Sequence, residues 1–250
     1  MQGDDLLPLL RKLESIGDPT EAEHRALASL RPAIRVLDAQ EDIVREGDRP
    51  RFVCLILDGF ACRHATVPSG RRQILSLHIP GDIPDVQGLF IKVMDHNLAT
   101  LTPARVALIQ HDALRELIDS NRRIANLLWR DSLVDAAIFR KWIVGIGRRT
   151  AYARFAHLVC EFAVRMHAVG LMEAKVCAMP FTQADMADAL GLSNVHVSRV
   201  LGRLRKQGLF TWQDGVLTIR NWQRLQKAAE FDPAYLQLDH IVGSGGLGSR

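Results

Sequence analysis

Hydrogen-bonding and basic side chains follow one another closely in the segment SNVHVSRVLGRLRKQG, which begins at Ser193. An arginine such as Arg199 can donate two parallel hydrogen bonds to the edge of guanine, and the amide of Asn194 can pair with adenine. Arg205 and Lys206, at the end of the segment, suit phosphate groups, which carry charge but no base identity. The chemistry that these residues could perform is the recognition of a DNA sequence.

Apolar residues in the same segment predict a helix with one buried side. Val197, Val200, Leu201 and Leu204 stand at positions i, i+3, i+4 and i+7, which is the spacing of one helix face. Ser193 is a favoured N-cap residue for such a helix. The residues left facing outward are Asn194, Val195, His196, Ser198, Arg199 and Arg203.

Another helix is predicted directly before this one, in FTQADMADALG. Thr182 can cap it, with Asp185 as the acid of a capping box, and Gly191 tolerates the left-handed backbone of a sharp turn. The two helices form a predicted helix-turn-helix from Gln183 to Lys206, whose second helix would enter the major groove. The alternative is an ordinary helical hairpin with a polar outer face. The residues predicted to contact DNA are Thr182, Gln183, Ser193, Asn194, Val195, His196, Ser198, Arg199, Arg203, Arg205 and Lys206.

The charge distribution agrees with a polyanionic partner for the C-terminal half. The net charge is +4, but residues 140–227 hold 14 Lys and Arg against five Asp and Glu. Residues 1–139 hold 17 basic and 20 acidic residues. A basic block of this kind favours binding to nucleic acid, although a merely solvated basic surface would have the same composition.

Short β-like runs separated by glycine turns fill the chain up to Gln110, after one or two predicted helices between Leu6 and Leu30. The runs are residues 33–38, 51–57, 60–67, 71–79 and 104–110. Closely spaced strands with turn residues between them predict a β-sandwich or β-roll.

A long helix is predicted over residues 111–147, where apolar residues recur every three or four positions and no proline interrupts residues 104–179. Its apolar stripe needs a partner, which is either its own domain or the same helix of a second subunit. The stripe residues predicted for a dimer are Ile124, Leu127, Leu128, Val134, Ile138 and Trp142.

The remaining elements complete a basic helical domain with a β-hairpin. A helix is predicted over residues 149–167 and a short strand over 175–179. The run LFTWQDGVLTIRN predicts a hairpin that turns at Asp214-Gly215 and forms a wing beside the recognition helix. Trp212 is expected in the core of the wing, and the alternative is that it faces phosphates. Residues 237–250, which end in the small and polar run GSGGLGSR, are predicted to be a flexible tail.

Composition and motifs narrow the class of protein. The chain has 250 residues, of which 48% are apolar, and no apolar run approaches the roughly 18 residues that span a bilayer. Its N-terminus lacks a signal-peptide core, so we expect a soluble cytoplasmic protein with no membrane partner. The four cysteines form no CxxC pair, which favours buried thiols over a metal site or redox sensor. No phosphate loop, GxSxG or HExxH occurs, and we expect no enzyme, no catalytic residue and no metal.

The segment FTQADMADALGLSNVHVSRVLGRLRKQGL resembles the helix-turn-helix of the Crp/Fnr family of bacterial transcription regulators. REGDRPRFVCLILDGFACRHATVPSGRRQILSLHIPGD resembles the β-roll of its cyclic-nucleotide-binding-type domain. The resemblance covers about Arg31 to Asn221. It implies an α+β fold with an N-terminal β-roll (double-stranded β-helix), a long central dimer helix and a C-terminal winged helix-turn-helix.

The domain boundaries expected on this basis are residues 1–30 for an N-terminal helical segment, 31–110 for the β-roll and 111–147 for the dimerisation helix. The DNA-binding domain then covers 148–236 and the tail 237–250. The partners implied are double-stranded DNA, a second copy of the chain and RNA polymerase. A two-fold dimer implies a palindromic operator with half-sites about 34–36 Å apart.

The effector pocket of the family aligns with Gly81, Asp82, Val86, His96 and Asn97. Val86 stands where cyclic-AMP receptors carry a glutamate for the ribose, and no arginine occurs between Arg72 and Arg105 to bind the cyclic phosphate. Cyclic AMP is therefore not expected. No cysteine precedes Cys54, so the iron–sulfur cluster of the oxygen-sensing branch is not expected either.

Haem is not expected, because each candidate ligand (His64, His78, His96 and His111) is better explained as a surface or hydrogen-bonded histidine. An unidentified small molecule is left as the effector. The family often carries an acidic residue where Val195 stands, so we expect a guanine contact from Arg199 and a different base, such as a thymine methyl, at Val195. The competing class is a regulatory subunit that acts on a protein, which would share the β-roll but needs no helix-turn-helix.

Overall fold

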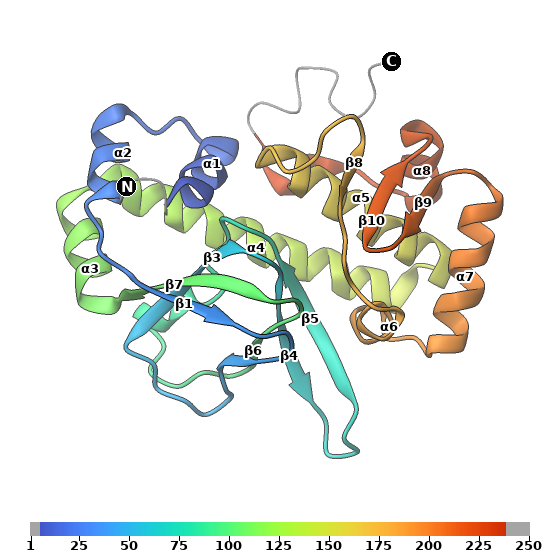
Figure 1. Ribbon diagram of the computed structural model, residues 1–250, viewed down its shortest axis with the longest axis horizontal. Helices are drawn as coiled ribbons and strands as arrows, with labels where there is room; N and C mark the ends of the chain where they lie inside the picture. The colour runs from blue at the N-terminus through green and yellow to red at the C-terminus, as the bar shows by residue number, and fades with distance from the viewer. Residues whose placement is uncertain (1–5, 239–250) are drawn as a thin grey trace. The chain divides into compact units, whose positions relative to one another are not determined.

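The computed structural model describes residues 6–238, in a chain that divides into two compact units at Asp135. The first unit opens with helices α1 (Leu7–Ile16) and α2 (Glu21–Ala28). Helix α2 begins at a capping box in which the Thr20 N–H donates to Glu23 Oε2 at 2.6 Å. The predicted N-terminal helical segment is therefore two helices (Figure 1).

Two antiparallel sheets follow. The first has the order β1 (Ala33–Leu37), β7 (Ala104–Gln110) and β3 (Phe52–Asp58). The second has the order β2 (Asp42–Val44), β6 (Asn97–Thr100), β4 (Ala61–Thr66) and β5 (Arg72–His78). A 3-10 turn, η1 (Val86–Leu89), lies between β5 and β6. The strands β2 and β6 were not predicted, because three and four residues are too short to show an alternating pattern.

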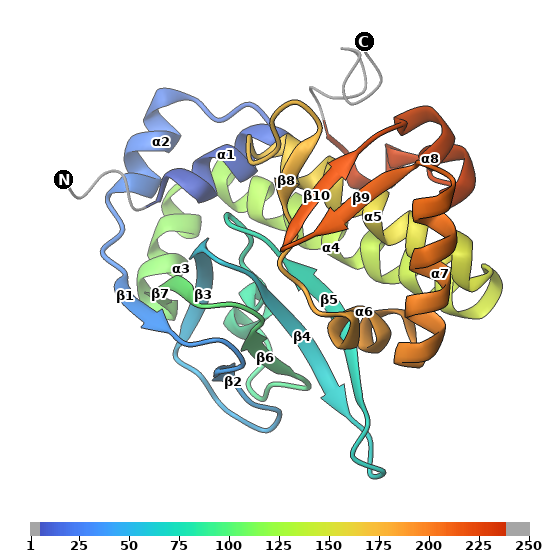
Figure 2. The same cartoon turned by 45° about the vertical axis from the view of Figure 1, so that its right-hand side comes forward.

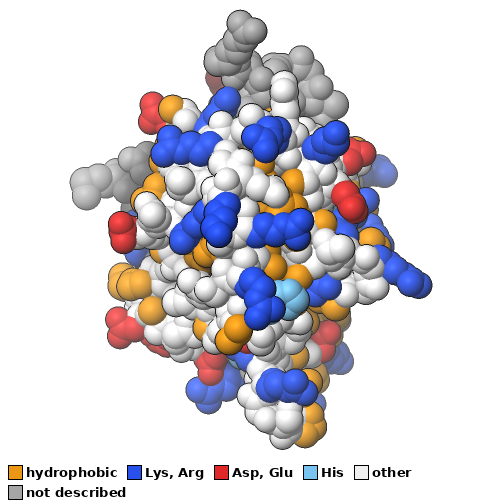
Figure 3. All heavy atoms as spheres, turned by 90° about the vertical axis from the view of Figure 1, so that its right-hand side faces the viewer, with side chains coloured by type: hydrophobic (Ala, Val, Ile, Leu, Met, Phe, Trp, Pro, Cys, Tyr) orange, Lys and Arg blue, Asp and Glu red, His pale blue; other side chains and the backbone are white. Residues whose placement is uncertain are grey.

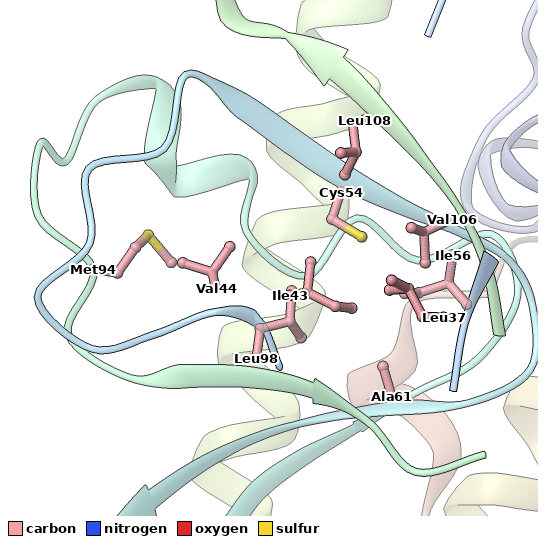
Figure 4. Packing of buried hydrophobic residues seen from close by; sticks show 10 residues of the cluster. All are labelled: Leu37, Ile43, Val44, Cys54, Ile56, Ala61, Met94, Leu98, Val106 and Leu108. Carbon is pink, nitrogen blue, oxygen red and sulfur yellow. The ribbon is translucent and has the colours of Figure 1, made fainter. Parts of the chain in front are cut away.

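The core of this unit lies between the two sheets (Figure 4). Apolar side chains from strands of both sheets point toward one another there and exclude water, which is the driving force of the packing. The cluster consists of Leu37, Ile43, Val44, Cys54, Ile56, Ala61, Met94, Leu98, Val106 and Leu108.

The predicted long helix is divided in two. Helix α3 (His111–Ser120) ends at Asn121, and helix α4 (Arg122–Arg148) begins there. The Asn121 Oδ1 accepts hydrogen bonds from the backbone N–H groups of Arg123 and Ile124, both at 3.1 Å. This side-chain cap satisfies N–H groups at the start of α4 and stabilises the break.

The second unit surrounds helix α5 (Ala151–Ala168). It contains β8 (Val176–Ala178), α6 (Gln183–Leu190), α7 (Asn194–Lys206), β9 (Phe210–Gln213) and β10 (Val216–Ile219). The strands form a small antiparallel sheet in the order β8-β10-β9 (Figure 2). The hairpin turns at Asp214 and Gly215, with φ of 51° and 74°, which is the left-handed pair that a two-residue turn requires.

Helix α8 (Trp222–Ala229) and the turn η2 (Pro233–Leu236) close this unit and were not predicted. Helix α8 packs against α5. In η2, the Tyr235 hydroxyl donates to Glu161 Oε2 at 2.6 Å, and the Tyr235 ring stacks on His157 with centroids 6.0 Å apart. The C-terminal segment is thus fixed to α5 by polar as well as apolar contacts.

All four cysteines are buried and form no disulfide. Among residues 6–238, no helix is both long enough and apolar enough to cross a bilayer. The same part of the chain contains no group of three His, Cys, Asp or Glu side chains that could hold a metal ion.

Candidate nucleic-acid interface

Helix α6 is held at its start by the capping box that the sequence predicted. The Asp185 N–H donates to Thr182 Oγ1 at 3.0 Å, and the Thr182 N–H donates back to Asp185 Oδ2 at 2.9 Å. Asp185 is buried while Thr182 and Gln183 are exposed. The start of the helix is therefore rigid and leaves two polar side chains on the surface.

The turn between α6 and α7 depends on one glycine. Gly191 has φ 62° and ψ 40°, a left-handed conformation that costs side-chain-bearing residues free energy. The Ser193 Oγ then accepts the His196 N–H at 3.3 Å and caps α7. These two local features set the direction in which α7 leaves the turn.

Helix α7 has one buried and one exposed side. Val197, Val200, Leu201 and Leu204 are all buried, whereas Val195 is 69% exposed. An apolar β-branched side chain that stands in solvent at the start of a recognition helix is available to a thymine methyl. Every residue predicted to contact DNA, from Thr182 to Lys206, is exposed.

Basic side chains spread over the side of the molecule that carries α7. Figure 3 shows Lys and Arg side chains across this face, with the acidic side chains near its margins. Cations of α7 are available to a phosphate backbone, because Arg199, Arg203, Arg205 and Lys206 are all exposed.

Two of these arginines have partners within the unit. The Arg203 guanidinium lies over the Tyr152 ring, 4.7 Å from its centroid. Arg205 donates through Nη2 to the backbone carbonyl of Trp212 in β9. Arg205, predicted as a phosphate contact, is therefore also a link between α7 and the wing.

The wing has the buried core that the sequence predicted. Trp212 is buried and donates from Nε1 to the Met179 carbonyl at 2.8 Å. Phe210 stacks on Phe155 of α5, with centroids 6.3 Å apart. Trp212 therefore anchors the hairpin and does not face phosphates.

Gly81 and Asp82, which were predicted to belong to an effector pocket, lie against helix α1. A Cβ at Gly81 would lie 2.5 Å from the Pro8 carbonyl of α1, and Gly81 has φ +97°. Lys12 Nζ lies 2.9 Å from Asp82 Oδ1 and 3.4 Å from Asp131 Oδ1 of α4. Helix α1 therefore covers this turn, held by a buried cation between two carboxylates.

The polar side chains among the other predicted pocket residues contact other groups of the chain. The Asn97 Oδ1 accepts the Glu46 N–H at 3.1 Å, and its Nδ2 donates to the His64 carbonyl at 3.3 Å. His96 is buried with Nδ1 2.7 Å from Asp95 Oδ1, and burial together with the charge of Arg63 lowers the pKa of His96. A neutral His96 and an apolar Val86 offer no fixed charge to a cyclic phosphate.

Arg63 is a buried cation that the sequence search missed. It comes from β4, and its Nε donates to the Pro84 carbonyl at 2.7 Å while its Nη1 lies 2.5 Å from Asp135 Oδ2. Asp85 is also buried and accepts the Cys54 N–H at 2.7 Å, and desolvation raises the pKa of Asp85 to about 7. No local motif pointed to Arg63, since it precedes the aligned pocket by about 20 residues in sequence.

Ser76, His78 and Asp82 form a hydrogen-bonded chain that resembles a hydrolase triad. Ser76 Oγ is 2.7 Å from His78 Nε2, and His78 Nδ1 is 3.4 Å from Asp82 Oδ2. Ser76 is 1% exposed, so its hydroxyl has no surface that a substrate can reach. Burial lowers the pKa of His78 to about 4. The chain satisfies buried polar groups.

Four of the six residues predicted for the dimer face of α4 are buried by the chain itself. Ile124, Leu128, Val134 and Ile138 are buried within the single chain, and Leu127 is half-buried. Trp142 donates from Nε1 to Glu161 Oε1 at 3.0 Å. The apolar residues that remain exposed on this helix are Trp129, Leu133, Ile143, Val144 and Ile146.

Comparison with known proteins covers both units. Residues 34–121 match the model of the cyclic nucleotide-binding domain, and residues 153–228 match that of the Crp-like helix-turn-helix domain. Transcriptional activator protein FnrL of Cereibacter sphaeroides is 26% identical over 178 residues, which is 70% of this chain and 71% of that protein. Regulatory protein HlyX of Actinobacillus pleuropneumoniae is 25% identical over 183 residues, 73% of this chain and 76% of the relative.

A solved structure shows the same architecture. FixK2 from Bradyrhizobium japonicum superposes with a TM-score of 0.72 and 25% sequence identity, over 80% of this chain and 98% of that chain. The order of β-sheet unit, long helix and helix-turn-helix unit, read first from the sequence, is thereby confirmed.

Proposed function

We propose that this chain, which belongs to the Crp/Fnr family of transcription regulators, binds a two-fold symmetric DNA site as a homodimer. The observation that carries the proposal is the division of α7 into a buried apolar side and an exposed side that carries Asn194, Val195 and Arg199. A recognition helix needs both: the buried side fixes its position, and the exposed side reaches base edges in the major groove.

Within this site, Arg199 is the proposed reader of guanine and Val195 a contact to a thymine methyl. Arg203 and Lys206, further along the helix, are proposed phosphate contacts. Arg205 is proposed to support the wing as well, because its guanidinium is bonded to the Trp212 carbonyl.

The dimer is proposed to form along α4 through a surface different from the one predicted. Trp129 and Leu133 are 64% and 60% exposed, and Ala136, Arg140 and Ile143 continue their spacing of alternating four and three residues. That spacing is a heptad seam. Large apolar side chains in solvent along such a seam favour a second copy of the same helix.

Replacement of Leu133 by glutamate should shift the protein from dimer to monomer in light scattering, since two like charges would then face each other across the seam. The same replacement at Ser132, beside the seam, should leave the dimer intact. If L133E remains dimeric at micromolar concentration, the seam is elsewhere.

The β-sheet unit is proposed to sense a signal other than cyclic AMP. Its aligned positions offer Val86, a buried His96 with a lowered pKa, and an Asn97 already bonded to backbone. The relative from Cereibacter sphaeroides is named a transcriptional activator, and we extend that role here, with RNA polymerase as the protein partner at the promoter.

The test of the proposed function is selection of bound duplexes from a random library by the purified full-length protein. A palindromic consensus with a guanine in each half-site is expected. Arg199→Ala should lower affinity for that consensus by about 1–3 kcal/mol and relax the preference at one base position. Equal loss on consensus and unrelated DNA would make Arg199 a phosphate contact instead, and failure to enrich any sequence would oppose the proposal.

A further inference from the structure

Arg203 lies on the exposed side of α7 four residues after Arg199. At 1.5 Å per residue this places it about 6 Å further toward the C-terminus of the helix. In a helix-turn-helix, base edges are reached by the N-terminal part of the recognition helix. Arg203 therefore stands where the helix has begun to leave the groove and the sugar-phosphate backbone passes.

The Arg203 guanidinium is held in place by an aromatic ring from another helix. Tyr152, in the first turn of α5, lies under it with the ring centroid 4.7 Å from Cζ. The Tyr152 hydroxyl donates to Oε1 of Gln207, the residue that ends α7. The ring is thus fixed by its backbone at one end and by a hydrogen bond at the other. The hydroxyl is protonated at neutral pH, as in any ordinary tyrosine, and partial burial raises the pKa of Tyr152 further.

Two arginine cations act on this tyrosine. The charges of Arg203 and of Arg224, in α8, both act on the Tyr152 hydroxyl. Among residues 6–238, neither guanidinium forms an ion pair with a carboxylate. An arginine that stacks by its face keeps the N–H groups along its edge available, and that edge fits a phosphate.

We propose that Tyr152 is a positioning residue for DNA binding, which holds Arg203 against the DNA backbone as a sequence-independent phosphate contact. The inference rests on the proposed function and adds a residue outside the helix-turn-helix. Arg199 then distinguishes sequences, while the Tyr152–Arg203 pair sets affinity and register. An Arg203 side chain that did not stack on a ring would lose conformational entropy when it bound DNA. Stacking on Tyr152 already orders the side chain in the unbound protein, so less entropy is lost on binding.

The test uses the full-length dimer and two duplexes, the selected consensus and an unrelated sequence of the same length, with affinity measured from low to moderate salt. Tyr152→Leu, which removes the aromatic face, should weaken binding to both duplexes by the same factor, about three-fold per subunit and about ten-fold for the dimer. Tyr152→Phe retains the face and should retain most of the affinity. Arg203→Gln should reduce the salt slope by about one for each subunit.

The decisive comparison is Tyr152→Leu in the Arg203→Gln background, where it should have no further effect. An equal effect in both backgrounds, or a loss confined to the consensus duplex, would overturn the inference. If Tyr152→Leu does not fold, Arg203→Lys provides the same test, because it keeps the charge but stacks less well. It should weaken both duplexes equally, and wild-type affinity would overturn the inference. A wild-type protein that binds neither duplex would overturn the proposed function itself.

Discussion

Removal of the buried cation Lys12 should strongly destabilise the first unit. Its Nζ lies 2.9 Å from Asp82 and 3.4 Å from Asp131, and at an effective dielectric constant of about 20 each attraction is about 5–6 kcal/mol. Desolvation of the three groups offsets most of that energy in the wild type. Lys12→Met, however, removes this cation from the buried Asp82 and the half-buried Asp131, and breaking a buried pair in this way costs about 3–5 kcal/mol.

The assay is unfolding in urea, with hydrogen exchange of peptides from β3 and β7 as the readout. Because both strands belong to the first unit, this readout reports the unfolding of that unit alone. Arg11→Met is the matched control, because Arg11 is the exposed neighbour on the same helix, and it should change the free energy of unfolding by less than about 0.5 kcal/mol. Burial already raises the pKa of Asp131. The loss in free energy of unfolding caused by Lys12→Met should therefore be smaller at pH 5 than at pH 8, where the carboxylates stay ionised.

Asp131→Asn in the Lys12→Met background should recover part of the lost stability, since it removes one of the two uncompensated charges. The reasoning would be refuted if Lys12→Met unfolded at the same urea concentration as Arg11→Met, or if its penalty were the same at both pH values.

Three further perturbations test other features. Gly81→Ala should destabilise the first unit in thermal unfolding by more than Gly70→Ala, because both glycines have positive φ but only Gly81 faces a carbonyl at 2.5 Å. Burial lowers the pKa of His157 to about 4, so the unfolded state takes up a proton below about pH 6.5 that the folded state does not. The unfolding free energy of the second unit should therefore fall between pH 6.5 and 4 in urea melts, with a shallower slope in His157→Gln. Arg205→Ala should speed hydrogen exchange in β9 and weaken binding to all duplexes, whereas Lys206→Ala should only weaken binding.

The helix-turn-helix could be predicted from the sequence because local interactions specify it. The Thr182 cap, the left-handed Gly191 and the apolar spacing from Val197 to Leu204 all act within a few residues. The longer strands could also be predicted, because each one appears in the sequence as a run of β-forming residues. These features do not depend on which distant segment packs against them.

The features that could not be predicted from the sequence depend on packing between segments that are distant in the chain. Helix α4 has apolar residues on more than one side, and its pattern alone does not tell which of them the chain itself buries; Leu128 and Val134 are buried, and Trp129 and Leu133 are exposed. Arg63 reaches Asp135 across 72 positions of sequence. Helix α8 has a cap at Asn221, whose Oδ1 accepts the Arg224 N–H at 3.0 Å, but only two buried residues, Leu225 and Ala229.

The C-terminal turn η2 determines how much chain an isolated DNA-binding fragment needs. Similarity to the helix-turn-helix model ends at residue 228, yet Phe231 and Leu236 are buried and Tyr235 donates to Glu161. A fragment cut where the similarity ends would uncover the apolar side of α5 and deprive a buried carboxylate of a hydrogen-bond donor. We expect such a truncation to lower the stability of the unit, and failure to bind DNA would then be a folding defect. The minimal functional fragment therefore extends at least through Leu238.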